Sequence, residues 1–389
     1  MSVADGRPMH GITDEFVTRL AERADEAERL RRLPAATVIE FKQTDLIRLL
    51  LPARFGGIQA SFPELLEPIR LMAHGCASSA WTLGFYALHN WMLSLFDPRL
   101  QEEVFASGPV LAPAPLAPAG RGRPADDGVR LTGRWSWATG AMDADWVIVG
   151  ALIERRDGVI PALVVVPADE VEVADVWHTA GMRGTGSHDL IATDVFVPEH
   201  RIVKVADIYG GTAPGAEFHG AATYRWPLVP ALALTAAMPV LGAAEQVTEL
   251  FAERLGGRVL AYSGVAQKDQ PAAQIRLGDA EVRLRALRAL ITETAEGIEH
   301  IVAAGERVRR STRANARLAA AYTVHECRSL IADLMEASGA SAHFLTNPLQ
   351  RAKRDVDIAS GHVVFDYDVG RELAGALAIG AKISPIAMI

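Results

Sequence analysis

The chain has 389 residues, of which half are hydrophobic and 22% are charged. Its 39 basic and 47 acidic side chains give a net charge of −8, which argues against a nucleic-acid-binding protein with a basic footprint. The apolar fraction excludes a disordered chain, and because only 6% of the residues are aromatic, the core must consist mainly of Ala, Leu, Val and Ile.

The sequence predicts a soluble cytoplasmic protein that binds neither a membrane nor nucleic acid. Its first residues lack the basic-then-apolar order of a signal peptide. The longest apolar run, from Leu228 to Ala244, is interrupted by Pro230 and Pro239 and is too short to span a bilayer comfortably. Cys76 and Cys327 alone cannot form a disulfide framework or a zinc site.

Residues 1–108 are predicted to form an N-terminal α-helical domain. Phe16, Leu20, Ala24 and Ala27 recur at about one helical turn, with charged residues between them. Breaks at prolines divide the region into four or five helices, the breaks being Pro34, Pro52, Pro63 and Pro98. The helix over Ser78–Phe96 is apolar nearly all round and should therefore lie in the interior.

Residues 109–220 are predicted to form a small central β domain, a barrel or a sandwich. Short runs rich in β-branched residues alternate there with turn signals such as Asp-Asp-Gly and Arg-Asp-Gly. The predicted strands are Val129–Trp137, Trp146–Leu152, Ile160–Val166 and Ile191–Val197.

Residues 221–389 are predicted to form a C-terminal four-helix bundle, which makes the fold class α+β. The four long helices expected are Pro230–Leu255, Ala272–Ala304, Ser311–Ser338 and Val363–Gly380. Five arginines recur near the start of the third helix, and at this spacing they are typical of a solvated or ion-paired face: Arg307, Arg309, Arg310, Arg313 and Arg317.

Short local motifs leave the chemistry open. The sequence contains no GxGxxG that opens a helix after a first strand, no Walker-type GxxxxGK[ST], no HExxH and no GxSxG. Longer constellations of residues must therefore indicate the function.

Three stretches resemble the acyl-CoA dehydrogenase superfamily, and specifically its oxygen-using branch of two-component flavin-dependent monooxygenases. Gly133–Gly140, which reads GRWSWATG, is similar to the signature at the strand that lines the flavin. Gly181–Ser187, followed by Asp194–Pro198, is similar to the second β-domain signature. Ser338–Ser341 and then 347–362 resemble the C-terminal segment that faces the flavin. The resemblance covers most of the chain from about Phe55 onward.

This resemblance implies the oxygenase component of a flavin-dependent monooxygenase, with reduced flavin (FMN or FAD) as cofactor and O2 as co-substrate. A separate NAD(P)H:flavin reductase would supply the reduced flavin. A flavin C4a-hydroperoxide would then transfer one oxygen atom to an aromatic or polycyclic small molecule. The resemblance also implies a homotetramer, with part of the apolar surface of the Ser78–Phe96 helix and of the C-terminal helices buried between chains.

His362 is the first catalytic candidate. Dehydrogenases of the superfamily need a carboxylate base, in many of them a Glu shortly after an Arg-Asp pair. After Arg354-Asp355 this chain carries no such Glu, and His362 stands in that neighbourhood. An imidazole that titrates near neutrality can take a phenolic proton or hold a peroxide oxygen by a hydrogen bond. The alternative is that His362 merely caps a helix.

His89 is the second catalytic candidate. Trp81, Phe85 and His89 are spaced i, i+4 and i+8, so they share one helical face. The resemblance places Trp81 beside the flavin and a histidine near position 89 toward the substrate. A core histidine with satisfied hydrogen bonds is the alternative.

The third catalytic candidate is Thr139, which stands beside Gly140 where the family more usually has Ser, and whose hydroxyl could bond the flavin near its reactive nitrogen. Ala114–Leu116 would occupy a flavin-side strand that is usually polar in the family. Arg258 would meet the flavin phosphate of a neighbouring subunit, and Gly339 and Ala340 are small enough to pass close to the cofactor. The complete set that the resemblance assigns to the cofactor is Trp81, Ala114, Pro115, Leu116, Trp137, Ala138, Thr139, Arg258, Gly339, Ala340, His362 and Val363.

Three other functions stay open. An N-oxygenase of an amine, such as a nucleotide-linked aminosugar, would need a basic pocket, for which Arg121 and Arg123 are candidates. An acyl-CoA dehydrogenase would need a carboxylate base that the sequence does not show. A non-enzymatic, flavin-free scaffold would bind neither oxidised nor reduced flavin.

Overall fold

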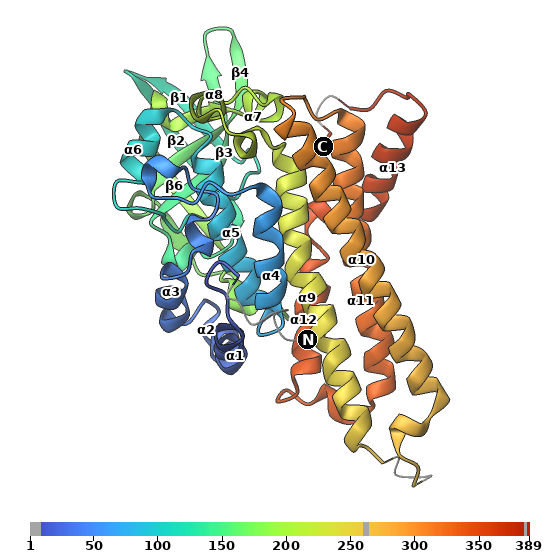
Figure 1. The fold of residues 1–389 in the computed structure, drawn as a ribbon. Coiled ribbons are helices and arrows are strands. Elements are labelled where there is room, and N and C mark those ends of the chain that lie inside the picture. The colour runs from blue at the N-terminus through green and yellow to red at the C-terminus, as the bar shows by residue number, and fades with distance from the viewer. Residues whose placement is uncertain (1–8, 260–263, 385–386) are drawn as a thin grey trace.

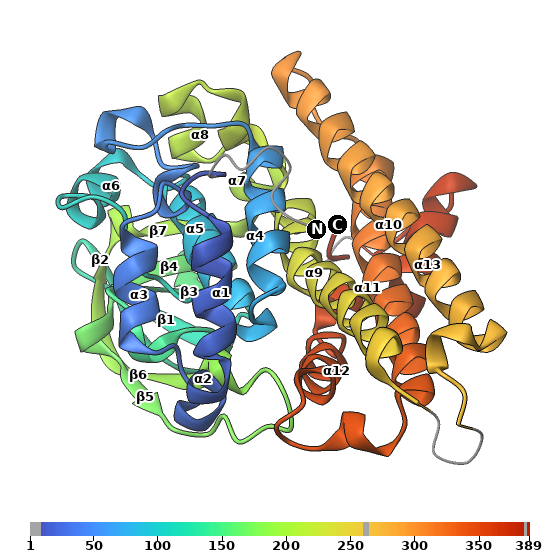
Figure 2. The ribbon, with the colours of Figure 1, turned by 60° about the horizontal axis from the view of Figure 1, so that its bottom comes forward.

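A computed structural model describes residues 9–259, 264–384 and 387–389. Residues 1–8, on which the prediction about a signal peptide mainly depends, lie outside the described residues. The chain passes from helices through a β-sheet and back to helices. Figures 1 and 2 show the first helices and the sheet on one side of the molecule and the long C-terminal helices on the other.

Within the described residues, six α-helices precede the sheet, whereas the sequence predicted four or five. They are α1 (Asp14–Glu22), α2 (Ala24–Leu30), α3 (Ala35–Lys42), α4 (Leu66–Ala73), α5 (Ala77–Leu93) and α6 (Pro98–Val104). The prediction used prolines as breaks, but α1 and α2 are separated at Arg23. All 17 residues of α5 are buried, which confirms the interior position predicted for Ser78–Phe96.

The described strands form one sheet in the order β5-β6-β2-β1-β3-β4-β7. β1 and β3 run parallel, and every other neighbouring pair is antiparallel. The four predicted strands are present as β2, β3, β4 and β6, whereas the glycine-rich β1 and the short β5 and β7 were not predicted. The bounds are β1 (Gly120–Ala125), β2 (Gly128–Ala138), β3 (Trp146–Arg155), β4 (Gly158–Pro167), β5 (Glu172–Ala174), β6 (His188–Pro198) and β7 (Ile202–Lys204).

The sheet curls round a core of its own. β4 and β6 lie four positions apart in the sheet and still contact each other, and Leu131, Val149, Val164 and Leu190 from four strands share one apolar cluster. The edges of the described sheet are β5 and β7, so it is open and curled, as in a sandwich, and is not the closed barrel that was the other prediction.

Two short helices, α7 (Val205–Gly210) and α8 (Pro214–His219), follow the last strand. They fall inside residues 109–220, which the sequence assigned to the β domain. The domain limits at 108/109 and 220/221 stay predictions.

Five α-helices follow in the described C-terminal region, whereas the sequence predicted four. They are α9 (Leu228–Gly257), α10 (Pro271–Ala303), α11 (Arg310–Ser338), α12 (Pro348–Ala359) and α13 (Tyr367–Ala378). The prediction missed α12 and began the last helix at Val363, where a 3₁₀ turn over Val363–Phe365 precedes α13.

The central helix of this region is α9, which packs against α4, α5, α10 and α11. By length and composition α9 could cross a membrane, but most of its apolar stretch is buried inside the protein, as expected of a core helix. The packing of α4 and α5 on α9 joins the N-terminal helices to the C-terminal ones.

Candidate active site

A row of rings on α5 forms the base of the candidate site. The Trp81 and Phe85 ring centroids lie 5.1 Å apart, and the Phe85 and His89 centroids lie 5.4 Å apart. The shared helical face predicted from the i, i+4, i+8 spacing is therefore present. Because α5 is buried along its whole length, segments from distant parts of the chain can meet it.

His362 meets the Trp81 end of this row. Its ring centroid lies 5.8 Å from that of Trp81 and 6.0 Å from that of Phe365, and Phe365 in turn lies 6.5 Å from Trp81. The structure thus brings the two candidate histidines to opposite ends of the Trp81–Phe85 pair.

Thr139 meets the same tryptophan from the sheet, just beyond the end of β2. The Trp81 indole Nε1 donates to the Thr139 hydroxyl at 3.4 Å, and that hydroxyl lies 3.0 Å from the Ser187 hydroxyl. Ser187 is bonded to Thr185 at 2.8 Å, and Thr185 donates to the Met182 carbonyl at 2.8 Å.

The direction of this chain of hydroxyls can be inferred. A carbonyl only accepts, so Thr185 spends its single proton on Met182; Ser187 must then donate to Thr185, and Thr139 must donate to Ser187. Since Trp81 donates to Thr139, the Thr139 oxygen keeps one lone pair free, which can accept a hydrogen bond from a bound molecule.

A bulge at the end of β2 presents Trp137 outward. The pairing of β2 with β6 shifts register between Trp135 and Ala138, and Trp137 has a positive φ of 65°. Its side chain is 72% exposed, whereas Ala138 is buried. Gly140 follows with a φ of 75°, and any Cβ there would lie 2.1 Å from the Tyr86 hydroxyl oxygen, so only glycine fits.

His89 is a neutral imidazole whose tautomer is fixed. Burial lowers its pKa to about 4, so the ring is uncharged at neutral pH. Nδ1 lies 2.5 Å from the Ala112 carbonyl, which only accepts, so Nδ1 carries the proton and Nε2 offers a lone pair. No carboxylate among the described residues offsets the effect of burial on this pKa.

His362 has the opposite tautomer. Its Nδ1 accepts a hydrogen bond from the Val364 amide at 3.2 Å, so in the neutral ring the proton lies on Nε2. His362 is an exposed residue, yet removal of its ring from water and, to a smaller extent, the Arg317 cation lower its pKa to about 4. The sequence argument that this ring titrates near neutrality is therefore wrong. The capping interpretation is also correct, since His362 caps the Val363–Phe365 turn.

The predicted flavin-side segment Ala114–Leu116 runs along β3. The amides of Ile148 and Gly150 donate to the carbonyls of Pro113 and Pro115 at 2.9 and 3.1 Å. Prolines have no N–H to return these bonds, which explains why this extended segment is not a regular strand. The segment lies beside His89 because the His89 Nδ1 is hydrogen-bonded to the carbonyl of Ala112, two residues before Ala114.

Arg258, Gly339 and Ala340 lie together elsewhere in the chain. Arg258 donates to the Ser338 carbonyl at 2.6 Å and to Gln267 at 3.2 Å, and its guanidinium would contact any side chain placed at Gly339. Arg258 directly follows the end of α9, and Gly339 and Ala340 directly follow the end of α11. The contacts found among the described residues do not join it to Trp81, Thr139 or His362.

The basic candidates for an aminosugar site are also separate. Arg121 and Arg123 are exposed on β1, and Arg123 pairs with Asp194 at 3.2 Å. They do not form a basic pocket with the α5 face.

Sequence reasoning missed the residues that hold the site together. Asp355 is buried and accepts a hydrogen bond from the Met182 amide at 2.5 Å, which fixes the loop that carries Thr185 and Ser187. Burial raises the pKa of Asp355 to about 6. Both segments were quoted in the resemblance, but pairing Asp355 with Met182 requires the three-dimensional arrangement.

Comparisons with known proteins agree with this geometry. Residues 234–367 match the family model described as "Acyl-CoA dehydrogenase, C-terminal domain". The oxygenase subunit HsaA of a flavin-dependent monooxygenase from Rhodococcus jostii is 32% identical over 95% of this chain and 98% of its own length. The chain belongs to the oxygenase components of two-component flavin-dependent monooxygenases.

Two further members show the range of this family. The oxygenase component of p-hydroxyphenylacetate 3-hydroxylase from Acinetobacter baumannii is 30% identical over 95% of this chain and 89% of its own. The structure of XiaF from Streptomyces sp. in complex with FADH2 and glycerol has a TM-score of 0.90 at 30% identity, covering 97% of this chain and 96% of that one. The predicted family, enzyme class, reduced flavin and O2 are thereby confirmed for this oxygenase.

The side chains of the α5 site have the chemistry to hold a flavin ring. Trp137 and Val363 are 72% and 58% exposed, so two large apolar side chains beside Thr139 and His362 have surface to offer a flat aromatic molecule. Thr139 adds one hydrogen-bond acceptor and His362 one donor. The roles of the individual residues stay predictions.

Proposed function

We propose that this oxygenase hydroxylates an aromatic small molecule, with reduced flavin delivered by a separate flavin reductase. The observation that carries the proposal is the pair of neutral imidazoles with opposite tautomers. His89 offers a lone pair at one end of the Trp81–Phe85 rings, and His362 offers an N–H at the other. The relatives that hydroxylate a phenol-containing acid support an aromatic substrate.

The cofactor would be held between Trp137, Thr139 and the His362–Val363 segment. Bound reduced flavin supplies the electrons that activate O2. The free lone pair of Thr139 matches the N–H that a flavin ring carries only when it is reduced. Trp81, Phe85 and Phe365 would exclude water from the reacting groups.

The two histidines would divide the work. His362 Nε2–H would donate a hydrogen bond to the oxygen derived from O2. This bond would hinder the loss of that oxygen as hydrogen peroxide. His89 Nε2 would accept a hydrogen bond from a substrate hydroxyl and so increase the electron density of its ring. With a pKa of about 4, His89 polarises that hydroxyl at neutral pH and does not hold its proton before the substrate reacts.

The proposal includes a homotetramer, which would complete the cofactor site. Arg258, Gly339 and Ala340 do not reach the α5 site of their own chain, which agrees with a contribution to a neighbouring subunit. Ile275 and Val282 on α10 are 70% and 60% exposed, as expected of a face that packs on another chain. Sedimentation at micromolar concentration should give a tetramer, and a monomer that binds flavin fully would contradict it.

The test is turnover with chemically supplied reduced flavin. Anaerobic titration with FMNH2 and FADH2 identifies the cofactor, and oxygen is then admitted with phenols, indoles, polyketide quinols or aminosugar nucleotides. We expect a hydroxylated aromatic product and tighter binding of reduced than of oxidised flavin. Oxidation of the aminosugar would indicate the N-oxygenase, reduction of bound flavin by an acyl-CoA would indicate the dehydrogenase, and failure to bind either flavin would indicate the scaffold.

A further inference from the structure

Arg317 on α11 is buried and bound to backbone. Its side chain is 3% exposed, so it departs from the solvated or ion-paired face that the sequence predicted for the five arginines. Nε donates to the Val364 carbonyl at 3.2 Å, Nη2 to the Val363 carbonyl at 3.0 Å and Nη1 to the Met388 carbonyl at 3.0 Å. Burying a cation costs free energy. Because Arg317 is bonded to backbone carbonyls in place of a carboxylate, we looked for a role for it in the site.

One of these bonds reaches His362 through a single peptide unit. The Val363 carbonyl and the Val364 N–H belong to the same planar group and point in opposite directions. Arg317 holds the carbonyl end, and the N–H end donates to His362 Nδ1. Fixing the carbonyl therefore fixes the donor that determines which imidazole nitrogen carries the proton.

The charge of Arg317 acts in the same sense. It is the charged group that lowers the pKa of His362, after removal of the ring from water. Trp81 of α5 and Phe365 of the 3₁₀ turn, the rings that contact the imidazole, carry no charge. Asp366 and Tyr209 act on Arg317 itself, whose own pKa burial lowers. A cation that polarises the peptide also strengthens its N–H as a donor.

We infer that Arg317 is a positioning residue for His362, which it orients with the ring proton on Nε2 through the Val363–Val364 peptide. The reason for this arrangement rests on the proposed function, because an Nε2–H donor is what the oxygen atom requires. The arrangement itself can be tested in the flavin-free protein.

The first measurement uses the unaltered protein. ¹⁵N-labelled histidine is followed by NMR from pH 4 to 8, and His362→Asn assigns the signal. We expect the His362 ring at pH 7 to be neutral with Nε2 protonated. A charged ring, or one with the proton on Nδ1, would overturn the inference without any arginine variant.

The second measurement removes the charge. In Arg317→Gln we expect the pKa of His362 to rise from about 4 toward its ordinary value of 6.5 and the tautomers to mix. Arg317→Lys keeps the positive charge but replaces the planar guanidinium with a single ammonium group. The pKa of His362 should therefore stay lower than in Arg317→Gln, while the two tautomers of His362 still mix. The matched control is Arg313→Gln, one turn earlier on α11, where the guanidinium holds the Tyr209 carbonyl at 3.3 Å; it should leave His362 unchanged.

The third measurement connects the inference to the reaction. With reduced flavin, O2 and substrate, Arg317→Gln should release a larger share of the consumed O2 as hydrogen peroxide, by severalfold, while Arg313→Gln behaves as the unaltered protein does. If His362 titrates identically in Arg317→Gln and in the unaltered protein, the inference is wrong, whatever the activity. If the unaltered protein makes no hydroxylated product but the titrations shift as expected, the proposed function fails and the positioning role of Arg317 stands.

Discussion

Two regions of this oxygenase hold histidines in contact with its interior, and the surroundings shift their pKa values in opposite directions. On α5 and beside it, His89 and His362 lie among rings and bond to backbone groups, and both pKa values fall to about 4. Between α4 and α9, His74 lies among carboxylates. Burial lowers its pKa there too, but hydrogen bonds to Glu245 and Glu249 outweigh burial, so that the pKa is raised.

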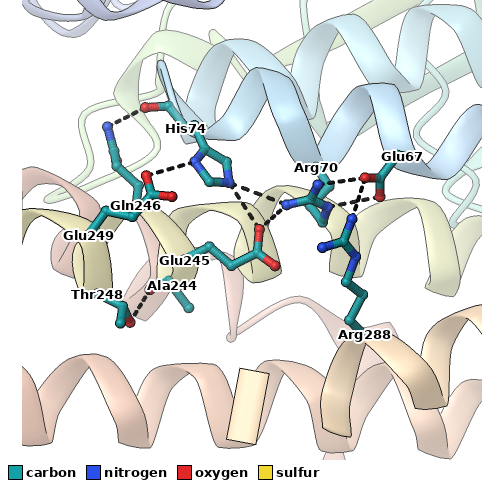
Figure 3. Close-up of polar contacts among 9 residues, drawn as sticks. All are labelled: Glu67, Arg70, His74, Ala244, Glu245, Gln246, Thr248, Glu249 and Arg288. Carbon is teal, nitrogen blue, oxygen red and sulfur yellow. Dashed lines mark hydrogen bonds and ion pairs between the residues drawn. The ribbon is translucent and has the colours of Figure 1, made fainter. Parts of the chain in front are cut away.

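The second region is a charged network, which Figure 3 shows in detail. His74 lies 2.9 Å from Glu245 and 3.3 Å from Glu249, and Glu245 also pairs with Arg70, which is 3% exposed. Glu67 closes the network by binding Arg70 on its own helix and Arg288 of α10, at 2.5 and 2.6 Å.

The difference shows that neighbours, more than depth, set the state of a histidine. Carboxylates raise the pKa of His74 and favour its charged form, which links the end of α4 to α9 in a structural role. Removal from water among uncharged rings keeps His89 and His362 neutral, which leaves one lone pair and one N–H for chemistry. Substitutions in the α5 site should therefore change the reaction, and substitutions in the charged network around His74 should change the stability of the protein.

The largest effect is expected from His362→Asn. Loss of a positioned donor should reduce hydroxylation at saturating reduced flavin by roughly 10²–10⁴-fold and divert O2 to hydrogen peroxide. Product and peroxide are quantified by chromatography and a peroxidase assay. His74→Gln is the matched control in the other region, and a comparable loss of hydroxylation there would erase the contrast.

The next effect is on stability. Arg70→Met removes a buried cation and leaves Glu67 and Glu245 partly uncompensated, so we expect a loss of about 3 kcal/mol in the free energy of unfolding. Urea denaturation measures it. The exposed pair of Arg276 with Glu336 supplies the control, since Arg276→Met should cost less than about 1 kcal/mol. Equal losses in the free energy of unfolding from the two variants would show that the buried network stabilises the protein no more than an exposed ion pair does.

The third prediction concerns pH. The pKa of His89 is about 4 in the folded protein, against an ordinary value of 6.5 that applies to the unfolded chain. As the pH drops, the unfolded chain therefore binds the proton first. The free energy of unfolding should fall by about 3 kcal/mol between pH 6.5 and pH 4. His74 has the opposite sign: its stabilisation is present below pH 6.5 and is lost as the pH rises through its raised pKa. His89→Gln should flatten the acid side of the stability profile and His74→Gln the other side. The same slopes in both variants would contradict the assignment.

The smallest effect is expected from Thr139→Val, which keeps the shape and removes the hydroxyl. Loss of one hydrogen bond should weaken binding of reduced flavin by about 1 kcal/mol, or roughly fivefold, with less change for oxidised flavin. Thr139→Ser should retain the preference. Anaerobic titration of both flavin states checks this, and an equal loss for both states would show that Thr139 does not distinguish them.

The sequence predicted the order of helices and strands well because strong periodicity and turn residues carry that information locally. It correctly placed Trp81, Phe85 and His89 on one face, since that depends only on helical spacing. It could not find that Asp355 binds the Met182 amide or that Arg317 binds Val363 and Val364, because those partners are far apart in the chain. It also misjudged the pKa of His362, which depends on removal from water and on the Arg317 cation that only the fold brings close.

The central claim is that the α5 site directs oxygen from O2 into an aromatic substrate. The most direct measurement supplies this oxygenase with reduced flavin and the turned-over aromatic compound under ¹⁸O2 and determines the label in the product. The account predicts one ¹⁸O atom in each hydroxylated product, with most of the label lost to hydrogen peroxide in His362→Asn. An unlabelled product, or an equal yield of labelled product from the unaltered protein and from His362→Asn, would contradict it.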